Sequence, residues 1–238
     1  MRKAGHILAE VLELMLEKAQ PGISTAELDR IAEDLIIQKG GTPGFKGYHG
    51  FPFTLCTAVD EIIVHGFPSA SQILKEGDLF TVDCGVIYKG FYSDAARSKI
   101  IGKRTLPVKE RLLSTAKKAL AKATELATPG RDINEIGSAI GEIIEKAGFH
   151  VIHDLTGHGI GRSLHEDPIV LNFDDGKPGP TLSPGMTIAI EPIFSAGTSE
   201  MKTLKDGWTI VTADGSPSVQ IENTILITPT GNEVLTQL

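Results

Sequence analysis

Apolar residues recur at helical spacing near the start of the chain. In residues 3–20 they return every three or four positions, at Ile7, Leu8, Val11, Leu12, Met15 and Leu16. This period predicts an amphipathic helix, which Pro21-Gly22 would end. A second helix is predicted from Ser24 to Gly40-Gly41, because Ser24 and Glu27 match a capping box and the glycines suit a helix end.

Strand patterns and further helical patterns follow. Residues 53–65 and 79–88 are rich in β-branched and apolar residues without a helical period, which predicts strands. The helical period returns at about 107–127 and 132–147. The pattern therefore predicts a chain that contains both helices and strands.

The chain aligns with itself at an offset of 108 positions. This shift places Pro21-Gly22 on Pro129-Gly130 and Gly40 on Gly148. It also places strand 79–83, which ends in Asp83, on residues 187–191, which end in Glu191. We therefore expect two related halves, about 1–107 and 108–238. They would form a single domain, 1–238, although 238 residues exceed the usual length of about 150.

Composition narrows the classes of function. The net charge is -7 and no basic block occurs, so nucleic acid and anionic membranes are disfavoured as partners. No apolar run reaches the roughly 18 residues of a membrane span, and acids interrupt any signal-peptide core near the N-terminus. The two cysteines, Cys56 and Cys84, lack a metal or redox spacing, which favours a reduced, cytoplasmic location.

Two aspartates flank a predicted hairpin turn. Asp83 and Asp94 lie on either side of Tyr88-Lys89-Gly90, and their odd spacing permits them to be directly opposite on one sheet face. Such a pair would either raise one pKa or bind a cation. Taken alone, the pattern is more typical of two exposed acids near a turn.

A glycine-rich segment and two later strands add candidate ligands. His158 lies among Gly157, Gly159 and Gly161, but the spacing does not match a dinucleotide fingerprint. Two further acids lie within predicted strands. The complete set of four carboxylates and one imidazole suits two hard or borderline divalent ions and excludes a zinc finger: Asp83, Asp94, His158, Glu191 and Glu222.

Six motifs together resemble the type I methionine aminopeptidases over nearly the whole chain. They occur in the order found in that family: Gly47-Tyr48-His49-Gly50, 60–66 (DEIIVHG), Asp83 with 94–97 (DAAR), 157–161 (GHGIG), 185–192 (GMTIAIEP) and Gln220-Ile221-Glu222. The resemblance implies an α+β fold of the pita-bread type, an antiparallel sheet flanked by helices with an internal pseudo-two-fold repeat. The family removes the initiator methionine from new polypeptides, preferentially when the second residue is small.

The resemblance also implies a two-metal centre. Asp94, His158, Glu191 and Glu222 would hold one ion, and Asp83, Asp94 and Glu222 the other. The ions would be cobalt, manganese, iron or zinc, and would activate a water that attacks the scissile carbonyl.

The catalytic groups follow from the same resemblance. Glu191 would accept a proton from the water and pass it to the leaving amine. His165 would hydrogen-bond the tetrahedral intermediate, and His65 would contact the peptide nitrogen and steer the substrate.

The resemblance to the methionine aminopeptidases also implies a pocket for the methionine side chain. An apolar, polarizable surface suits its thioether. Four positions depart from the common family pattern: Phe45, Val64, Leu164 and Asn223. Phe45 and Leu164 change the pocket volume in opposite directions, and Asn223 adjoins Glu222, one of the implied metal ligands. The residues expected to form the pocket wall are Tyr48, His49, Phe51, Cys56 and Trp208, while Phe53 is assigned to the core.

Two alternatives stay open at this point. An Xaa-Pro aminopeptidase or dipeptidase of the same fold would share the ligand set, but such enzymes usually carry an extra N-terminal domain. A non-catalytic peptide-binding homologue would typically have lost ligands, and here all five are present. We expect a monomer that acts on the N-termini of nascent chains, with the ribosome as a partner.

Overall fold

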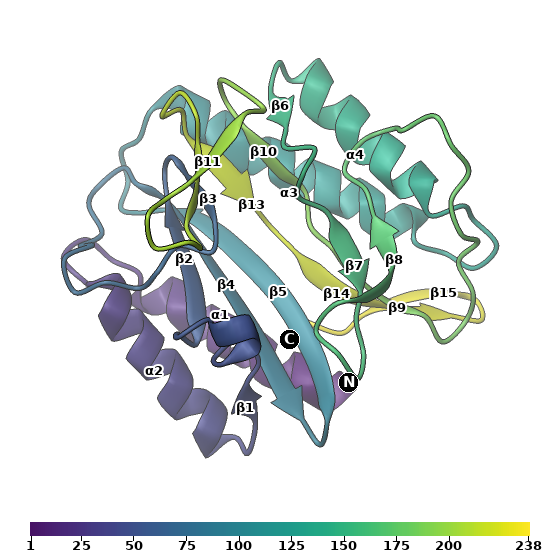
Figure 1. Ribbon diagram of the computed structural model, residues 1–238, viewed down its shortest axis with the longest axis horizontal. Coiled ribbons are helices and arrows are strands. Elements are labelled where there is room, and N and C mark those ends of the chain that lie inside the picture. Colours follow the sequence, from purple (N-terminus) through teal and green to yellow (C-terminus); the bar gives the residue numbers. More distant parts are fainter.

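The computed structural model describes residues 1–238, with two pairs of long helices beside a set of antiparallel strands (Figure 1). The helices lie at most two residues from their predicted bounds: α1 (Arg2–Lys18), α2 (Thr25–Gln38), α3 (Pro107–Leu126) and α4 (Asn134–Lys146). The Ser24 hydroxyl accepts a hydrogen bond from the Glu27 backbone N–H at 3.2 Å, as the capping box predicts. No helix is long and apolar enough to span a bilayer.

A four-stranded sheet lies in the first half of the chain. Its strand order is β1-β4-β2, and β5 pairs with β4. The β4–β5 turn consists of Lys89 and Gly90, both with positive φ, as a tight two-residue hairpin requires. The strands of the first half are β1 (Thr42–Pro43), β2 (Leu55–Val59), β3 (Ile62–Val64), β4 (Leu79–Tyr88) and β5 (Phe91–Ile100).

The single strand predicted at residues 53–65 is two strands in the structure. Asp60 adopts a φ of 53°, which turns the chain between β2 and β3. Its side chain accepts a hydrogen bond from the Leu79 backbone N–H at 3.0 Å and so stabilises this turn. β3 joins a different sheet, with order β11-β12-β3.

The second half contributes the remaining strands. They form a five-stranded sheet of order β15-β14-β9-β7-β8 and a three-stranded sheet of order β13-β10-β6. Every strand pair in the molecule is antiparallel. The strands are β6 (His150–Val151), β7 (Gly157–Gly159), β8 (Glu166–Val170), β9 (Thr187–Ile190), β10 (Ile193–Ser195), β11 (Met201–Thr203), β12 (Ile210–Thr212), β13 (Ser218–Gln220), β14 (Asn223–Thr228) and β15 (Gly231–Val234).

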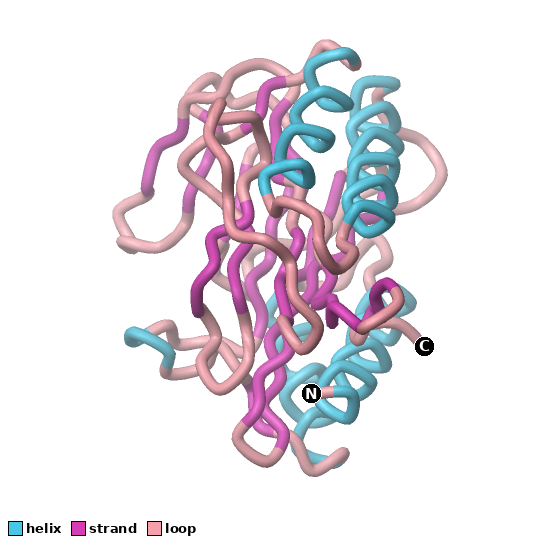
Figure 2. Tube along the Cα trace, turned by 90° about the vertical axis from the view of Figure 1, so that its right-hand side faces the viewer, coloured by secondary structure: helices cyan, strands magenta, loops and turns pink.

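Both helix pairs lie on the same side of the strands, as the turned view shows (Figure 2). Each pair covers its own apolar core: a cluster of 18 buried residues lies with α1 and α2, and one of 22 with α3 and α4. The helices therefore exclude water from one face of the sheets. The face away from the helices is the one that can carry a cluster of polar side chains.

The offset of 108 also relates details of the backbone. The molecule has two isolated β-bridges, Ser24 with Ile73 and Asp132 with Thr181, which are 108 positions apart. The hydrogen bond from Gly22 N–H to Leu74 O likewise has its counterpart, from Gly130 N–H to Leu182 O. Both of these glycines have positive φ, which a side chain would disfavour.

Candidate metal and peptide site

Strand alternation places four acids on the face away from the helices. Val82 and Cys84 of β4 point into the core beneath α1 and α2, so Asp83 between them points the opposite way. The same alternation holds at Asp94 on β5 and continues past the strand ends at Glu191 and Glu222. Both were predicted within strands, but Glu191 directly follows β9 and Glu222 lies between β13 and β14. Asp94 precedes core residue Ala95, Glu191 follows Ile190, and Glu222 follows Ile221.

The register of the β4–β5 hairpin corrects one prediction. Asp83 is opposite Ala96, and Asp94 is opposite Gly85, so the two aspartates are diagonal rather than directly opposite neighbours. The reason is the turn, which uses only Lys89 and Gly90. Both aspartates still share one face of the sheet, and both are buried rather than exposed at the turn.

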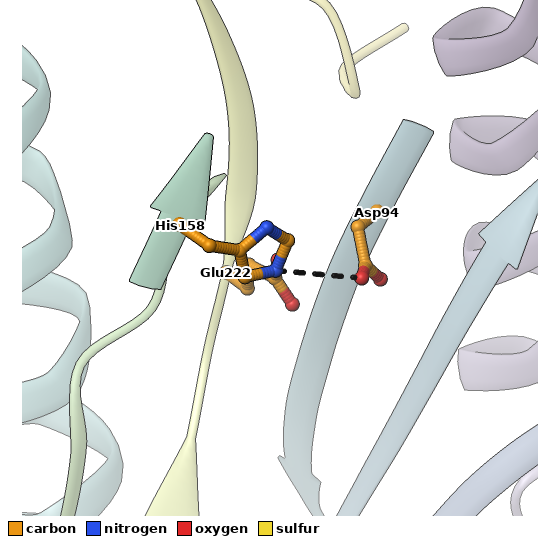
Figure 3. A group of neighbouring side chains, drawn as sticks. All are labelled: Asp94, His158 and Glu222. Atoms are coloured by element: carbon orange, nitrogen blue, oxygen red, sulfur yellow. Dashed lines mark ion pairs between the residues drawn. The ribbon is translucent and has the colours of Figure 1, made fainter. Parts of the chain in front are cut away.

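His158 completes the cluster from the second half. It lies on β7, opposite Ala189, and its Nε2 is 3.9 Å from Asp94 Oδ2, with Glu222 beside the same ring (Figure 3). The same Nε2 is 3.7 Å from Glu191 Oε1. These distances are too long for hydrogen bonds but suit ligands that share an ion about 2 Å from each. Nδ1 lies 2.8 Å from the Gly159 carbonyl, which orients the ring and leaves Nε2 free to ligate.

The electrostatics of this cluster indicate a cation site. The four acids are at most 8% exposed. Burial raises the pKa of Asp83 to about 7, and burial followed by mutual repulsion raises the pKa values of Asp94, Glu191 and Glu222 well above the ordinary range. Burial lowers the pKa of His158 to about 4, so the imidazole is a neutral potential ligand.

Unpartnered oxygens support the same conclusion. One carboxylate oxygen each of Asp83, Asp94 and Glu222 is buried without a hydrogen-bond partner. Ligand atoms of Asp94, His158 and Glu222 lie within 4.8 Å of one another. Buried acids that lack donors are costly unless a cation neutralises them, so the donor set fits hard or borderline divalent ions.

The acids form the floor of a cavity of about 420 Å³. Cys56 is directly opposite Asp83 across β2 and β4, so the cavity wall and the acid cluster adjoin. All the residues that the sequence singled out for catalysis, metal binding or the pocket line this cavity: Tyr48, His49, Phe51, Cys56, His65, Asp83, Asp94, His158, His165, Glu191, Trp208 and Glu222.

An aromatic cluster forms the cavity's apolar wall. The Phe51 ring packs edge-on against Trp208 at 5.2 Å and against Phe67 at 5.5 Å. Phe45 and Leu164 are buried in the same cluster and also line the cavity. Phe53 packs behind Phe51 and is not among the lining residues, in agreement with its assignment to the core.

Two further histidines face the cavity. His65 stacks edge-on against Trp208 with ring centroids 6.1 Å apart, and Nδ1 of His165 lies 2.9 Å from the Tyr48 hydroxyl. The pKa of each of these imidazoles is lowered, mainly by burial and to a smaller extent by the charge of a neighbouring histidine. Both imidazoles therefore favour the neutral form. The sequence prediction gave Tyr48 only a wall role and did not anticipate its hydrogen bond.

Two residues that hold Glu191 were not predicted. Gln220 Nε2 donates to Glu191 Oε2 at 3.2 Å, and Asn172 Nδ2 donates to the Glu191 carbonyl at 2.9 Å. Gln220 could have been found, because it lies two residues before Glu222 and therefore on the same strand face. Asn172 carried no comparable signal, since its partner lies 19 positions away.

Comparisons with known proteins agree with this geometry. Residues 1–229 match the metallopeptidase family M24. A methionine aminopeptidase of Clostridium perfringens is 48% identical over 236 residues, which cover 99% of this chain and 94% of that protein.

Solved structures give the same result for the fold. The crystal structure of methionine aminopeptidase from Thermotoga maritima superposes with a TM-score of 0.97 at 39% identity, covering 100% of this chain and 95% of that one. A prolidase from Pyrococcus furiosus reaches a TM-score of 0.80 at 26% identity, covering 100% of this chain but 62% of that one. The predicted pita-bread α+β fold is confirmed, and the chain belongs to metallopeptidase family M24 and, within it, to the methionine aminopeptidases.

Proposed function

We propose that this chain removes the N-terminal methionine from nascent polypeptides and prefers a small second residue. The observation that carries this proposal is the contact between an acid cluster and an apolar pocket in one cavity. Asp83 and Cys56 are cross-strand partners, so a side chain held in the pocket would present its own α-amine and carbonyl to the acids. The 48% identical relative from Clostridium perfringens, named a methionine aminopeptidase, supports the same activity.

The acids and His158 would hold two divalent ions. Asp94, His158, Glu191 and Glu222 serve one ion, and Asp83, Asp94 and Glu222 serve the other. Such ions, whether cobalt, manganese, iron or zinc, supply Lewis acidity and lower the pKa of a bound water toward about 7.

Glu191 accepts and returns the proton in this proposal. Its carboxylate faces the cavity, with Oε2 held by Gln220 and its backbone carbonyl held by Asn172. With one carboxylate oxygen and the main chain both held, the other carboxylate oxygen would be free to take a proton from water and deliver it to the leaving amine.

His165 and His65 act on the peptide bond. Because both imidazoles favour the neutral form, each has one donor and one acceptor nitrogen at neutral pH. His165 donates to the oxygen that becomes negative in the tetrahedral intermediate, a contribution of about 2–4 kcal/mol for one such donor. His65 contacts the peptide nitrogen and orients the scissile bond.

The pocket wall selects the first side chain. Tyr48, His49, Phe51, Cys56 and Trp208 surround the space next to Asp83. The apolar rings and the buried thiol offer polarizable contacts to a thioether, which favours methionine.

The setting of the reaction is part of the proposal. The substrate is the free N-terminus of a nascent chain, and the ribosome is the partner that presents it in the cytoplasm. Residues 1–238 act as one domain and as a monomer, in which the halves 1–107 and 108–238 supply ligands to a shared centre. Asp83 and Asp94 come from the first half, and His158, Glu191 and Glu222 from the second.

Turnover of matched peptides tests the substrate. Peptides that begin Met-Gly should be cleaved, whereas matched Xaa-Pro peptides should not, and a library assayed with each metal in turn would define both preferences. Cleavage of Xaa-Pro peptides alone would favour the related proline-specific activity of the same fold. That activity has less support, because 64–68 (VHGFP) and Gln220-Ile221-Glu222 resemble the methionine enzymes.

Replacement of His158 tests the metal assignment. His158→Ala should reduce kcat/KM by several orders of magnitude. His153→Ala is a matched control, because His153 stacks on Phe173 outside the cavity and should leave activity unchanged. Full activity of His158→Ala would contradict the assignment, and absence of turnover by the native chain with every metal would favour a non-catalytic peptide-binding role.

A further inference from the structure

Side chains, rather than a strand ladder, join the two halves beside the acid cluster. β5 pairs only with β4 in a sheet, although it runs next to β13 and β14 (Figure 1). The direct backbone link here is from Glu222 N–H to the Ala96 carbonyl, at 3.0 Å. Asp94 lies on one side of this junction and Glu222 on the other, so the spacing of these two acids depends on the junction.

Thr224 holds the backbone of Asp94 from across the junction. Its hydroxyl accepts from Asp94 N–H at 3.0 Å and donates to the Asp94 carbonyl at 2.7 Å. Thr224 is fully buried and lies two residues after Glu222. One hydroxyl thus replaces the pair of backbone bonds that a neighbouring strand would have made.

Arg97 holds the backbone of Glu222 from the opposite direction. Its Nη1 donates to the carbonyls of Glu222 at 2.6 Å and Ala96 at 3.0 Å. Its Nη2 donates to Asn223 Oδ1 at 2.9 Å and to the Thr236 carbonyl at 2.6 Å. The planar, rigid guanidinium group carries enough N–H donors to bind these four acceptors at once, which a lysine ammonium group cannot do in this geometry.

Thr236 closes the network. Its hydroxyl accepts from Thr224 N–H at 3.1 Å and donates to Asn223 Oδ1 at 3.0 Å. Thr236 is fully buried. The segment after β15 therefore fixes both residues that follow Glu222.

We propose that Thr224 and Arg97 are positioning residues that set the spacing of Asp94 and Glu222 and thereby the affinity for divalent metal. This inference rests on the two-metal site of the proposed function. Asp94 Oδ1 and Glu222 Oε1 are buried without a hydrogen-bond partner, so the main chain that Thr224 and Arg97 hold contributes to the placement of both acids. Groups that orient ligands in this way typically change metal affinity when they are removed.

Metal titration of the apo protein tests the proposal without relying on activity. Thr224→Val keeps the side-chain shape but removes the hydroxyl, and should weaken binding of Mn²⁺ or Co²⁺ by about 10- to 100-fold in calorimetry. Thr224→Ser keeps the hydroxyl and should stay within about 3-fold of the native affinity. The absorption spectrum of the Co²⁺ form should change in Thr224→Val and not in Thr224→Ser.

Arg97→Lys provides a second variant that retains the charge. A lysine cannot supply the fork, so we expect metal affinity to fall about 10-fold even though the net charge is unchanged. This variant keeps the proposal falsifiable if Thr224→Val does not fold.

Lys109→Met separates positioning from general stability. Lys109 also joins the two halves, through Asp60 and the Gly77 carbonyl, but it does not line the cavity. It should lower the unfolding temperature of the apo protein without changing metal affinity. Native affinity in a folded Thr224→Val or Arg97→Lys variant would overturn the positioning role alone, whereas failure of the native chain to bind any divalent ion would overturn the metal site as well.

Discussion

The Tyr48 hydroxyl lies 2.9 Å from Nδ1 of His165, although the two residues are 117 positions apart. With the hydroxyl as donor, Nδ1 is the acceptor and the neutral imidazole carries its proton on Nε2. His165 would then offer a donor to the oxygen of the tetrahedral intermediate. Tyr48 thus combines a ring in the apolar wall with a hydroxyl that selects a histidine tautomer.

Replacement of Tyr48 by Phe should lower kcat more than it changes KM. The ring would remain in the wall, but His165 would lose the bond that fixes its tautomer, a loss of about 1 kcal/mol or about 3- to 10-fold in kcat. Steady-state kinetics on a Met-Gly peptide would measure this effect. In a His165→Ala background the same change should have no further effect, and additive losses would contradict the coupling.

Gly85 provides the space that the Phe45 ring occupies. It lies two residues after Asp83 on the same face of β4 and is opposite Asp94. A Cβ at Gly85 would lie 2.7 Å from Phe45 Cε1, closer than side chains normally approach. Phe45 therefore packs directly against the strand that carries Asp83.

Gly85→Ala should destabilise the protein by about 1–3 kcal/mol and raise KM for methionine peptides, because the Phe45 ring must shift. Thermal unfolding and kinetics would measure the two effects. Phe45→Ala removes the ring that the new methyl group meets, so the double variant should lose less stability than the sum of the two single losses. Additive losses would contradict this contact.

The regular elements and the identities of the candidate residues could be predicted from the sequence, but their mutual geometry could not. The helix bounds follow from apolar period and from caps such as Ser24, which are local signals. The diagonal placement of Asp83 and Asp94 depends on which residues form the turn: a two-residue turn at Lys89 and Gly90 makes them diagonal, whereas the same turn one residue earlier would place them directly opposite. The division of residues 53–65 depends on the backbone of Asp60.

Contacts across the whole chain also escaped prediction. The Tyr48–His165 bond spans 117 positions and the Thr224–Asp94 bonds span 130. No local pattern encodes such pairs, because each partner alone is typical of a loop or strand. The metal-ligand set was accessible because motifs supplied by the family resemblance identify it without any geometry.

Phe45 and Leu164 share one apolar cluster, and the sequence shows a large residue at the first position and a smaller one at the second. Leu164→Phe alone should overfill the cavity and lower kcat/KM for methionine peptides. The exchange Phe45→Leu with Leu164→Phe conserves volume and should restore most of that loss. A double-mutant cycle would measure the coupling, and independent losses would show that the two side chains fill separate spaces.

Removal of metal should make stability fall as pH rises. The raised pKa of Asp83 means that the folded apo protein holds a proton that the unfolded chain releases. The stability it contributes is present below about pH 4 and is lost as pH rises through about 7. Asp94, Glu191 and Glu222 act with the same sign. His158, whose pKa is lowered to about 4, acts with the opposite sign below about pH 6.5, as do His65 and His165, but these three imidazoles oppose four acids and have little effect above that pH.

Unfolding temperatures of metal-free and metal-loaded protein from about pH 5 to about pH 8 would measure this dependence. Metal should raise the unfolding temperature more at the higher pH, because ions displace protons from the same carboxylates. Glu222→Gln removes one of these protons and one ligand, so it should flatten the pH dependence of the apo protein and reduce the stabilisation by metal. Equal stabilisation by metal at both ends of the range would show that the buried acids already carry their charges without an ion.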